Sequence, residues 1–168
     1  MKIRFMKVKN LLSIWMLFVL ISIGTVVQAS EDISSVIETN HAYVNAVPPV
    51  MKVTAAYMHI SNHSHQMLRL IGASSPIAGK VTLHNSSKKS GMMRMMAMDA
   101  IEIASHDTVM FSPGGLHLML EKLKKPLKAG AHVDITLLFA DDKHVTVHAP
   151  VRDLREESDG HGGHHHHH

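Results

Sequence analysis

The chain has 168 residues, with 16 histidines, 13 methionines and no cysteine. Residues 1–29 hold four of its 17 Lys and Arg residues and none of its 14 Asp and Glu residues, which leaves 13 basic against 14 acidic residues in the remainder. This near balance gives no support for nucleic-acid binding. The absence of cysteine excludes disulfides and thiolate metal sites.

Residues 1–29 have the pattern of a secretory signal peptide. Basic residues precede an apolar run over residues 11–27, and small residues precede a cleavage position between Ala29 and Ser30. A retained membrane anchor is the alternative, but Ser, Gly and Thr residues dilute the run, and no cysteine follows it for lipid attachment. We therefore expect cleavage, export to the periplasm and no stable membrane insertion afterwards.

Residues 30–154 are expected to form one domain of short β-strands. Residues 53–60 and 67–71 are apolar and β-prone, and the polar residues 61–65 between them indicate a hairpin. Four further segments alternate between apolar and polar residues, which is typical of strands with one buried face. They are residues 81–84, 116–120, 132–137 and 144–149. With turn residues between these segments, the predicted fold is an all-β sandwich or barrel.

Two of the alternating strands carry histidine or methionine on the face opposite their apolar residues. In residues 81–84, the valine and leucine share one face, so His84 is predicted to point outward. In residues 116–120, three leucines share one face, and His117 and Met119 project together from the other. Two such residues can converge on one ion.

A methionine-rich segment, residues 91–98, lies between these strands. In an extended conformation Met93 and Met95 share one face, and Met92, Met96 and Met98 share the reverse face. A single methionine most often fills a gap in a core. We expect one of the two sets to be core and the other to form a surface lined by sulfur.

His84, Met95, His117 and Met119 follow the pattern His-x10-Met-x21-His-x-Met. Thioether sulfur is a poor ligand for hard ions and a good one for Cu(I), and imidazole also binds copper. The combination of these four side chains therefore points to Cu(I).

The same spacing is the signature of the periplasmic copper chaperones called PCu(A)C, which this sequence resembles over residues 41–151. The flanking sequence is also similar to that of the family, including Pro48-Pro49, Gly72-Ala-Ser-Ser-Pro76 and Pro113-Gly-Gly-Leu-His-Leu-Met-Leu120. The resemblance implies a cupredoxin-like Greek-key β-barrel that binds Cu(I) through the four residues. It also implies delivery to the binuclear copper centre of cytochrome c oxidase, beside a thiol-containing copper chaperone. Residues 85–90, rich in Ser and Lys, depart from the family pattern and put an accessory ligand there in doubt.

Other functions are less consistent with this ligand set. A blue-copper electron carrier needs a cysteine thiolate, which the chain lacks. The sequence offers no plausible nucleophile or acid/base pair, so we expect no enzyme activity. The alternative to delivery is a periplasmic copper buffer or resistance protein, which sequesters metal through the same site and the C-terminal histidines.

Two further groups of residues are auxiliary candidates. Residues 155–168 are too rich in Gly and His to form a core and are expected to be disordered, either as a native tail that recruits Cu(II) or Zn(II) or as a purification tag. The candidate auxiliary ligands in this tail are His161, His164, His165, His166, His167 and His168. Met93, in the methionine-rich segment, is a further auxiliary candidate. His59, His63, His65 and Met67 form a second cluster, for which a solvated turn is favoured over a metal site.

Overall fold

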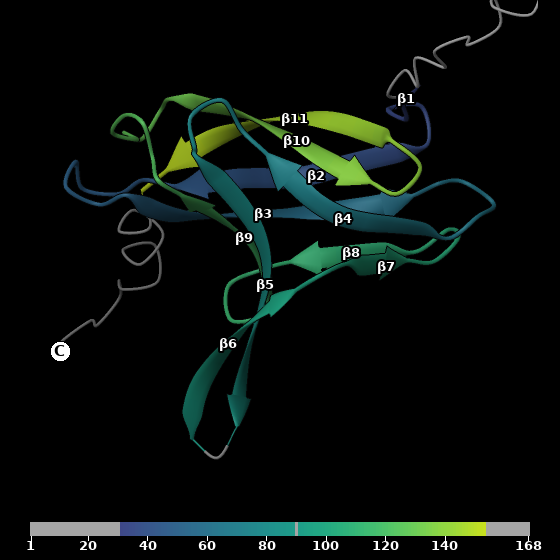
Figure 1. Cartoon of the computed structure of the whole chain (residues 1–168), viewed down its shortest axis with the longest axis horizontal. Coiled ribbons are helices and arrows are strands. Elements are labelled where there is room, and N and C mark those ends of the chain that lie inside the picture. Colours follow the sequence, from purple (N-terminus) through teal and green to yellow (C-terminus); the bar gives the residue numbers. More distant parts are fainter. Residues whose placement is uncertain (1–30, 90, 154–168) are drawn as a thin grey trace, which may run out of the picture.

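Eleven β-strands make up the part of the chain that the structure describes, residues 31–89 and 91–153 of a computed structural model (Figure 1). In chain order they are β1 (Glu31–Asp32), β2 (Ile37–Asn45), β3 (Val53–Asn62), β4 (Leu68–Ser74), β5 (Lys80–Lys89), β6 (Met92–Met98), β7 (Ile101–Ile103), β8 (Thr108–Phe111), β9 (Leu116–Glu121), β10 (His132–Phe139) and β11 (Lys143–Arg152). None of the described residues is helical, so none belongs to a helix that could cross a membrane. The all-β prediction is confirmed.

Seven of the strands close into a barrel. The hydrogen-bonded order runs β5-β9-β3-β2-β11-β10-β4, and a pairing of Ala73 in β4 with Val81 in β5 completes the ring. The connections from β3 to β4 and from β9 to β10 join strands that are not neighbours, as in Greek-key folds. The other strands attach to this ring at its edges, with β6 on β5, β7 on β4, β8 on β3 and β1 on β11.

Alternation along the strands divides the barrel into a core and an outer face. In β3, Ala56, Met58 and Ile60 are fully buried, whereas Tyr57 and His59 between them are half-buried on the outer face. The largest core side chains come from strands all round the ring. They include Phe111, Leu118, Leu120, Ile135, Leu137 and Phe139. Full burial of each such side chain stabilises the folded state by about 1.5–3 kcal/mol. The register of each strand is therefore determined by the need to keep its apolar face in the core.

The predicted hairpin between residues 53–60 and 67–71 is wrong, because β3 and β4 do not pair with each other. Strand β3 pairs with β2, β8 and β9, whereas β4 pairs with β10, β5 and β7. The buried Asn62 turns the chain between them. Its side-chain amide donates to the carbonyl oxygens of Gln66, Ile103 and Ala104, while its side-chain oxygen accepts from Ser64. These contacts tie the connection to the β7–β8 segment.

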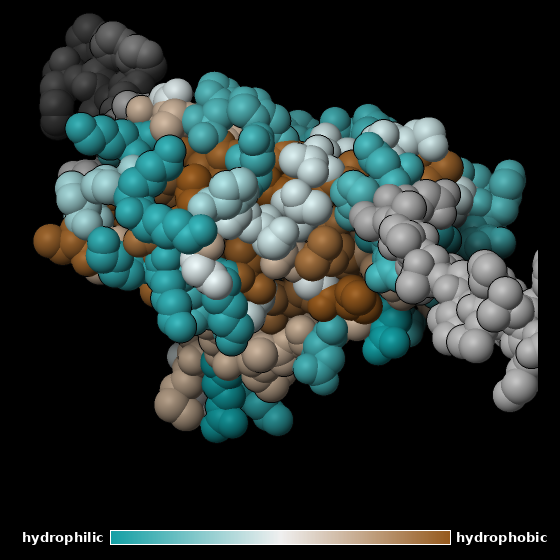
Figure 2. Space-filling view, turned by 45° about the horizontal axis from the view of Figure 1, so that its top comes forward, coloured by the Kyte–Doolittle hydropathy of each residue, from teal (hydrophilic) through white to brown (hydrophobic). Residues whose placement is uncertain are grey.

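Strands β5 and β6 form a hairpin that projects beyond the barrel (Figure 1). Strand β5 pairs with β9 only from Lys80 to Asn85, but with β6 as far as Lys89. Methionines of both faces are therefore exposed, and the expectation that one set is core is wrong. The exposed fractions are 60% for Met92 and Met93 and 53% for Met95 and Met96, and only Met98 packs against the core. Figure 2 shows apolar surface at the bottom of the molecule, where this hairpin projects.

The predicted signal peptide, residues 1–29, lies outside the described residues, as does the histidine-rich segment, residues 155–168. The proposed domain boundaries therefore stay predictions. The strands themselves begin at Glu31 and end at Arg152, within the predicted domain of residues 30–154.

Candidate metal centre

Two histidines face each other on adjacent strands of the barrel. His84 of β5 and His117 of β9 are direct cross-strand partners, and their ring centroids are 5.7 Å apart at an interplanar angle of 30°. Both lie on the outer face, since Leu83 and Leu118 beside them are buried. Two imidazoles that bind one ion through bonds of about 2.0–2.1 Å have centroids roughly 5–6 Å apart. The pair therefore has the separation of a shared metal site.

The two methionines of the motif lie on the same outer face as the histidines. Met119 is opposite Thr82 in β5, and Met95 of β6 is opposite Ser86. Because residues two apart on a strand share a face, Met119 is next to His117 and Met95 is diagonal to His84. The register thus brings the four predicted residues, which are distant in sequence, to one face of β6, β5 and β9.

His117 is held in one orientation although it projects away from the core. It is only 5% exposed, because neighbouring side chains on the outer face cover it, among them Tyr57, whose ring centroid is 6.3 Å away. Its Nδ1 is 3.0 Å from the carbonyl oxygen of Gly115 and donates to it. This hydrogen bond fixes the tautomer and leaves the Nε2 lone pair available to a metal ion. Burial also raises the pKa of the Tyr57 hydroxyl.

A chain of hydrogen bonds fixes the tautomer of His84 as well. The Thr82 hydroxyl donates to a carboxylate oxygen of Glu121 at 3.1 Å, and it lies 3.0 Å from Nε2 of His84. Since the hydroxyl hydrogen is used for Glu121, Nε2 carries a proton and donates to Thr82. Nδ1 of His84 then bears the lone pair, and this buried atom has no hydrogen-bond partner among the described residues. Buried polar atoms are seldom left without a partner, so a metal ion bound at Nδ1 fits the site.

The electrostatic surroundings keep His84 neutral. Burial is the largest cause that lowers the pKa of its imidazole, and the nearby His117 and Lys80 side chains lower it further, against an opposing effect of Glu121. Imidazole must be neutral to bind a metal ion. The site therefore keeps the ligand form of His84 to lower pH than a free histidine would.

A metal site on this face needs the two thioether sulfurs in addition to the two imidazoles. Among residues 31–89 and 91–153, no group of three or more His, Cys, Asp or Glu side chains could hold a metal ion. Two imidazoles and two thioethers form a neutral, soft set that is suited to Cu(I). Sequence reasoning missed the supporting residues Thr82, Glu121 and Tyr57. The first two could have been found, because each lies two residues from a predicted ligand on the same face.

The auxiliary residues are not all in reach of this site. Met93 lies opposite Lys88, one outward position beyond Met95 on the same face of the hairpin. His161 and the five histidines at residues 164–168 lie outside the described residues. Their predicted role as auxiliary ligands stays a prediction.

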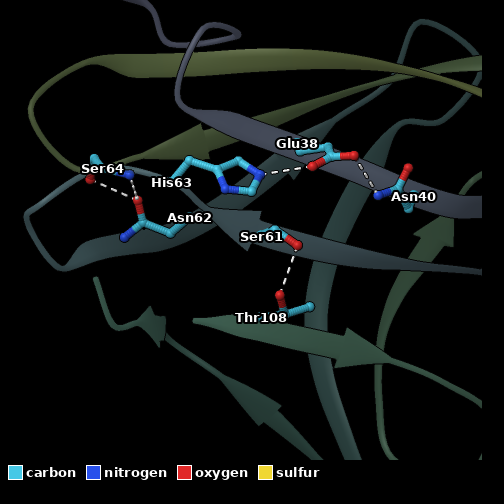
Figure 3. Close-up of polar contacts among 7 residues, drawn as sticks. All are labelled: Glu38, Asn40, Ser61, Asn62, His63, Ser64 and Thr108. Carbon is cyan, nitrogen blue, oxygen red and sulfur yellow. Dashed lines mark hydrogen bonds and ion pairs between the residues drawn. The ribbon is translucent and has the colours of Figure 1, made fainter. Parts of the chain in front are cut away.

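The predicted second cluster of His59, His63, His65 and Met67 is not brought together as one group. His63 contacts Glu38 at 2.7 Å (Figure 3), and His65 contacts His106 at 3.1 Å. The ring of His59 instead lies 4.9 Å from that of His41. The turn after β3 is held by its own polar contacts, such as those of Asn62 with Ser64 (Figure 3).

Comparisons with known proteins agree with this fold. The sequence model of the family described as "Putative lipoprotein LpqE-like" matches residues 37–151. The protein named "Putative lipoprotein Lxx21020" from Leifsonia xyli subsp. xyli is 32% identical over 128 residues, which cover 76% of each chain.

Two solved structures extend the comparison. The solution structure of CuI-DR1885 from Deinococcus radiodurans is 37% identical, with a TM-score of 0.58 over 71% of this chain and 79% of that chain. The copper-bound PCuAC domain from PmoF2 is 26% identical, with a TM-score of 0.59 over 70% of this chain and 92% of that domain. These matches confirm the expected PCuAC-type, cupredoxin-like β fold.

Proposed function

Because this chain belongs to the LpqE-like lipoprotein family and has the fold of copper-bound PCuAC domains, we propose that it binds one Cu(I) ion and delivers it to an acceptor protein. The proposed ligands are His84, Met95, His117 and Met119. The observation that carries the proposal is the facing histidine pair, in which Nδ1 of His84 is buried and has no hydrogen-bond partner within residues 31–89 and 91–153. Bound copper gives that lone pair a partner.

The types of ligand favour the binding and transfer of Cu(I) over electron transfer or catalysis. Blue-copper sites use a cysteine thiolate, and this chain has no cysteine. Four neutral ligands leave the positive charge on Cu(I), and thioethers bind it less strongly than thiolates do. Transfer to an acceptor with cysteine ligands is then favourable, so the proposed role is a metallochaperone rather than an enzyme.

We place this activity in the periplasm and propose the copper-bearing subunit of cytochrome c oxidase as the acceptor. The predicted signal peptide supports export, and the name of the Leifsonia relative as a lipoprotein is consistent with a role in the cell envelope. A thiol-containing copper chaperone is the proposed partner on the same route. Its thiols supply the stronger ligands that the transfer requires.

Copper sequestration is the second candidate function. Histidine rings contact each other at three further places on the described surface, namely His41 with His59, His65 with His106, and His132 with His148. Such pairs, with the histidines of residues 155–168, would increase the number of copper ions that one chain can bind. Stoichiometry separates the candidates, because delivery predicts one tight Cu(I) per chain and storage predicts several of similar strength.

The hairpin offers a matched pair of variants to test the proposed site. Met95 and Met96 are neighbours on β6, each 53% exposed, but only Met95 lies on the face of the histidine pair. We expect Met95→Leu to weaken Cu(I) binding about tenfold or more, as expected for losing a ligand or a residue that supports one. Met96→Leu should leave the affinity unchanged. The measurement is a competitive titration against a chromophoric Cu(I) chelator without oxygen.

The outcome that would contradict the proposed site is equal affinity in the two variants. Each substitution replaces one exposed apolar side chain by another of similar volume, so neither should disturb the barrel. A His117→Ala variant provides a second comparison, because it removes the buried imidazole itself. Unchanged Cu(I) affinity in this variant and in Met95→Leu would exclude the four-residue site.

A further inference from the structure

A bulge in β2 places a second histidine pair on the outer face of the barrel. The register between β2 and β3 shifts between Asn40 and Tyr43, and His41 in the bulge has a φ of 53°. This left-handed conformation is uncommon for residues other than glycine. Bulges redirect side chains, and backbone strain of this kind is often found at functional sites. Here the bulge brings the His41 ring to 4.9 Å from that of His59.

The two rings are free to bind an ion together. Their planes are tilted by 57°, and within residues 31–89 and 91–153 neither ring makes a side-chain hydrogen bond or ion pair. Their centroid separation is near the roughly 5–6 Å of two imidazoles that share one ion.

The other histidine pairs on the described surface are less suited to this. His132 and His148 are stacked in parallel, with an interplanar angle of 4°, and His148 also contacts Asp134 at 2.6 Å. Lone pairs in two parallel ring planes do not converge on one ion. His65 and His106 already use one nitrogen each in a mutual contact of 3.1 Å.

A thioether lies on the other side of His59. Met110 of β8 is the direct cross-strand partner of His59, and cross-strand partners have Cβ atoms about 4.5–5.5 Å apart on the same face. Its side chain is 60% exposed, so it is not part of the core. His59 therefore has His41 on the β2 side and Met110 on the β8 side. We propose that His41, His59 and Met110 form a second Cu(I) site.

This second site is on the same outer face as the first, and the two sites are neighbours along β3. Tyr57 and His59 are two residues apart on the outer face of β3, and Tyr57 lies beside His117 of the first site. Residues two apart on a strand have α-carbons about 6.5–7 Å apart. Three ligands on a more exposed part of the face should bind Cu(I) more weakly than the four of the first site. The second site thus adds a weaker holding position beside the tighter one.

Residue-specific NMR of the full chain tests this site separately from the others. Cu(I) is added without oxygen until the spectrum stops changing, so that every site is filled. We expect the first equivalent to shift the ring signals of His84 and His117. Later equivalents should shift the ring signals of His41 and His59 and the methyl signal of Met110. If the His59 and Met110 signals stay unmoved at saturation, the second site is refuted, whatever happens at His84 and His117.

Two variants complete the test. His41→Asn keeps a residue that tolerates the left-handed conformation, and Met110→Leu replaces one exposed apolar side chain by another. We expect each to raise the Cu(I) concentration needed to shift His59 about tenfold or more, with the response of His84 unchanged. His65→Asn, in the neighbouring loop, is the control and should have no effect. A His59 response that is the same in His41→Asn and Met110→Leu as in the unaltered chain would overturn the proposal.

Discussion

Thr82 is the residue whose substitution tests the geometry of the proposed site most sharply without removing a ligand. Its hydroxyl accepts from Nε2 of His84 at 3.0 Å while donating to Glu121 at 3.1 Å. Thr82→Val has nearly the same shape but cannot accept, so the proton of His84 is no longer fixed on Nε2. Loss of such a supporting contact typically lowers metal affinity by 10–100-fold, or about 1.4–2.7 kcal/mol.

The assay is the competitive Cu(I) titration, with Thr136→Val as the matched control. Thr136 also forms a side-chain hydrogen bond, at 3.0 Å to Thr146, but on β10 and β11, away from the site. The control should bind Cu(I) like the unaltered chain. Glu121→Gln retains an oxygen that can accept from Thr82 and should weaken binding less than Thr82→Val does. Cu(I) affinity of folded Thr82→Val within threefold of the unaltered chain would refute the tautomer assignment.

Three further predictions concern pH, the tail and the core. The pKa of His84 is lowered in the folded chain, so the unfolded chain takes up this proton first. The contribution of His84 to stability should be complete above about pH 6.5 and lost as pH falls through the lowered pKa. Cu(I) affinity should likewise fall as the pH drops through the lowered pKa of His84, and an affinity that stays flat over the whole acidic range in which the chain remains folded would contradict imidazole ligation. Removing residues 156–168 should leave the tight Cu(I) affinity unchanged and reduce Cu(II) binding measured by calorimetry; a weaker Cu(I) site would show that the tail supplies a ligand. Leu118→Ala should lower the free energy of unfolding in urea by about 2–5 kcal/mol, whereas Leu138→Ala, at a side chain 37% exposed, should lower it much less.

The outer-face residues could be predicted from the sequence because strand alternation is local. The buried leucines in β9 leave His117 and Met119 on the other face, whatever the neighbouring strand is. That β5 lies beside β9, so that His84 faces His117, came only from the family resemblance. Pairing between distant strands is not encoded in the periodicity of either one.

The features that the sequence did not reveal depend on such distant contacts. The predicted hairpin between β3 and β4 failed because Asn62 binds carbonyl groups of Ile103 and Ala104, about 40 residues away along the chain. The exposure of the methionines in β6 follows from how far the hairpin extends past β9. The position of His41 depends on a β-bulge, which no pattern in the sequence predicts.

The central claim is that two imidazoles and two thioethers bind one Cu(I) ion. X-ray absorption spectroscopy of the full chain, loaded with one equivalent of Cu(I), measures those ligands directly. The account predicts a coordination shell with both nitrogen and sulfur scatterers, in which Met95→Leu loses part of the sulfur contribution and Met96→Leu does not. A shell of nitrogen alone, or a sulfur contribution that is the same in Met95→Leu and Met96→Leu, would contradict it.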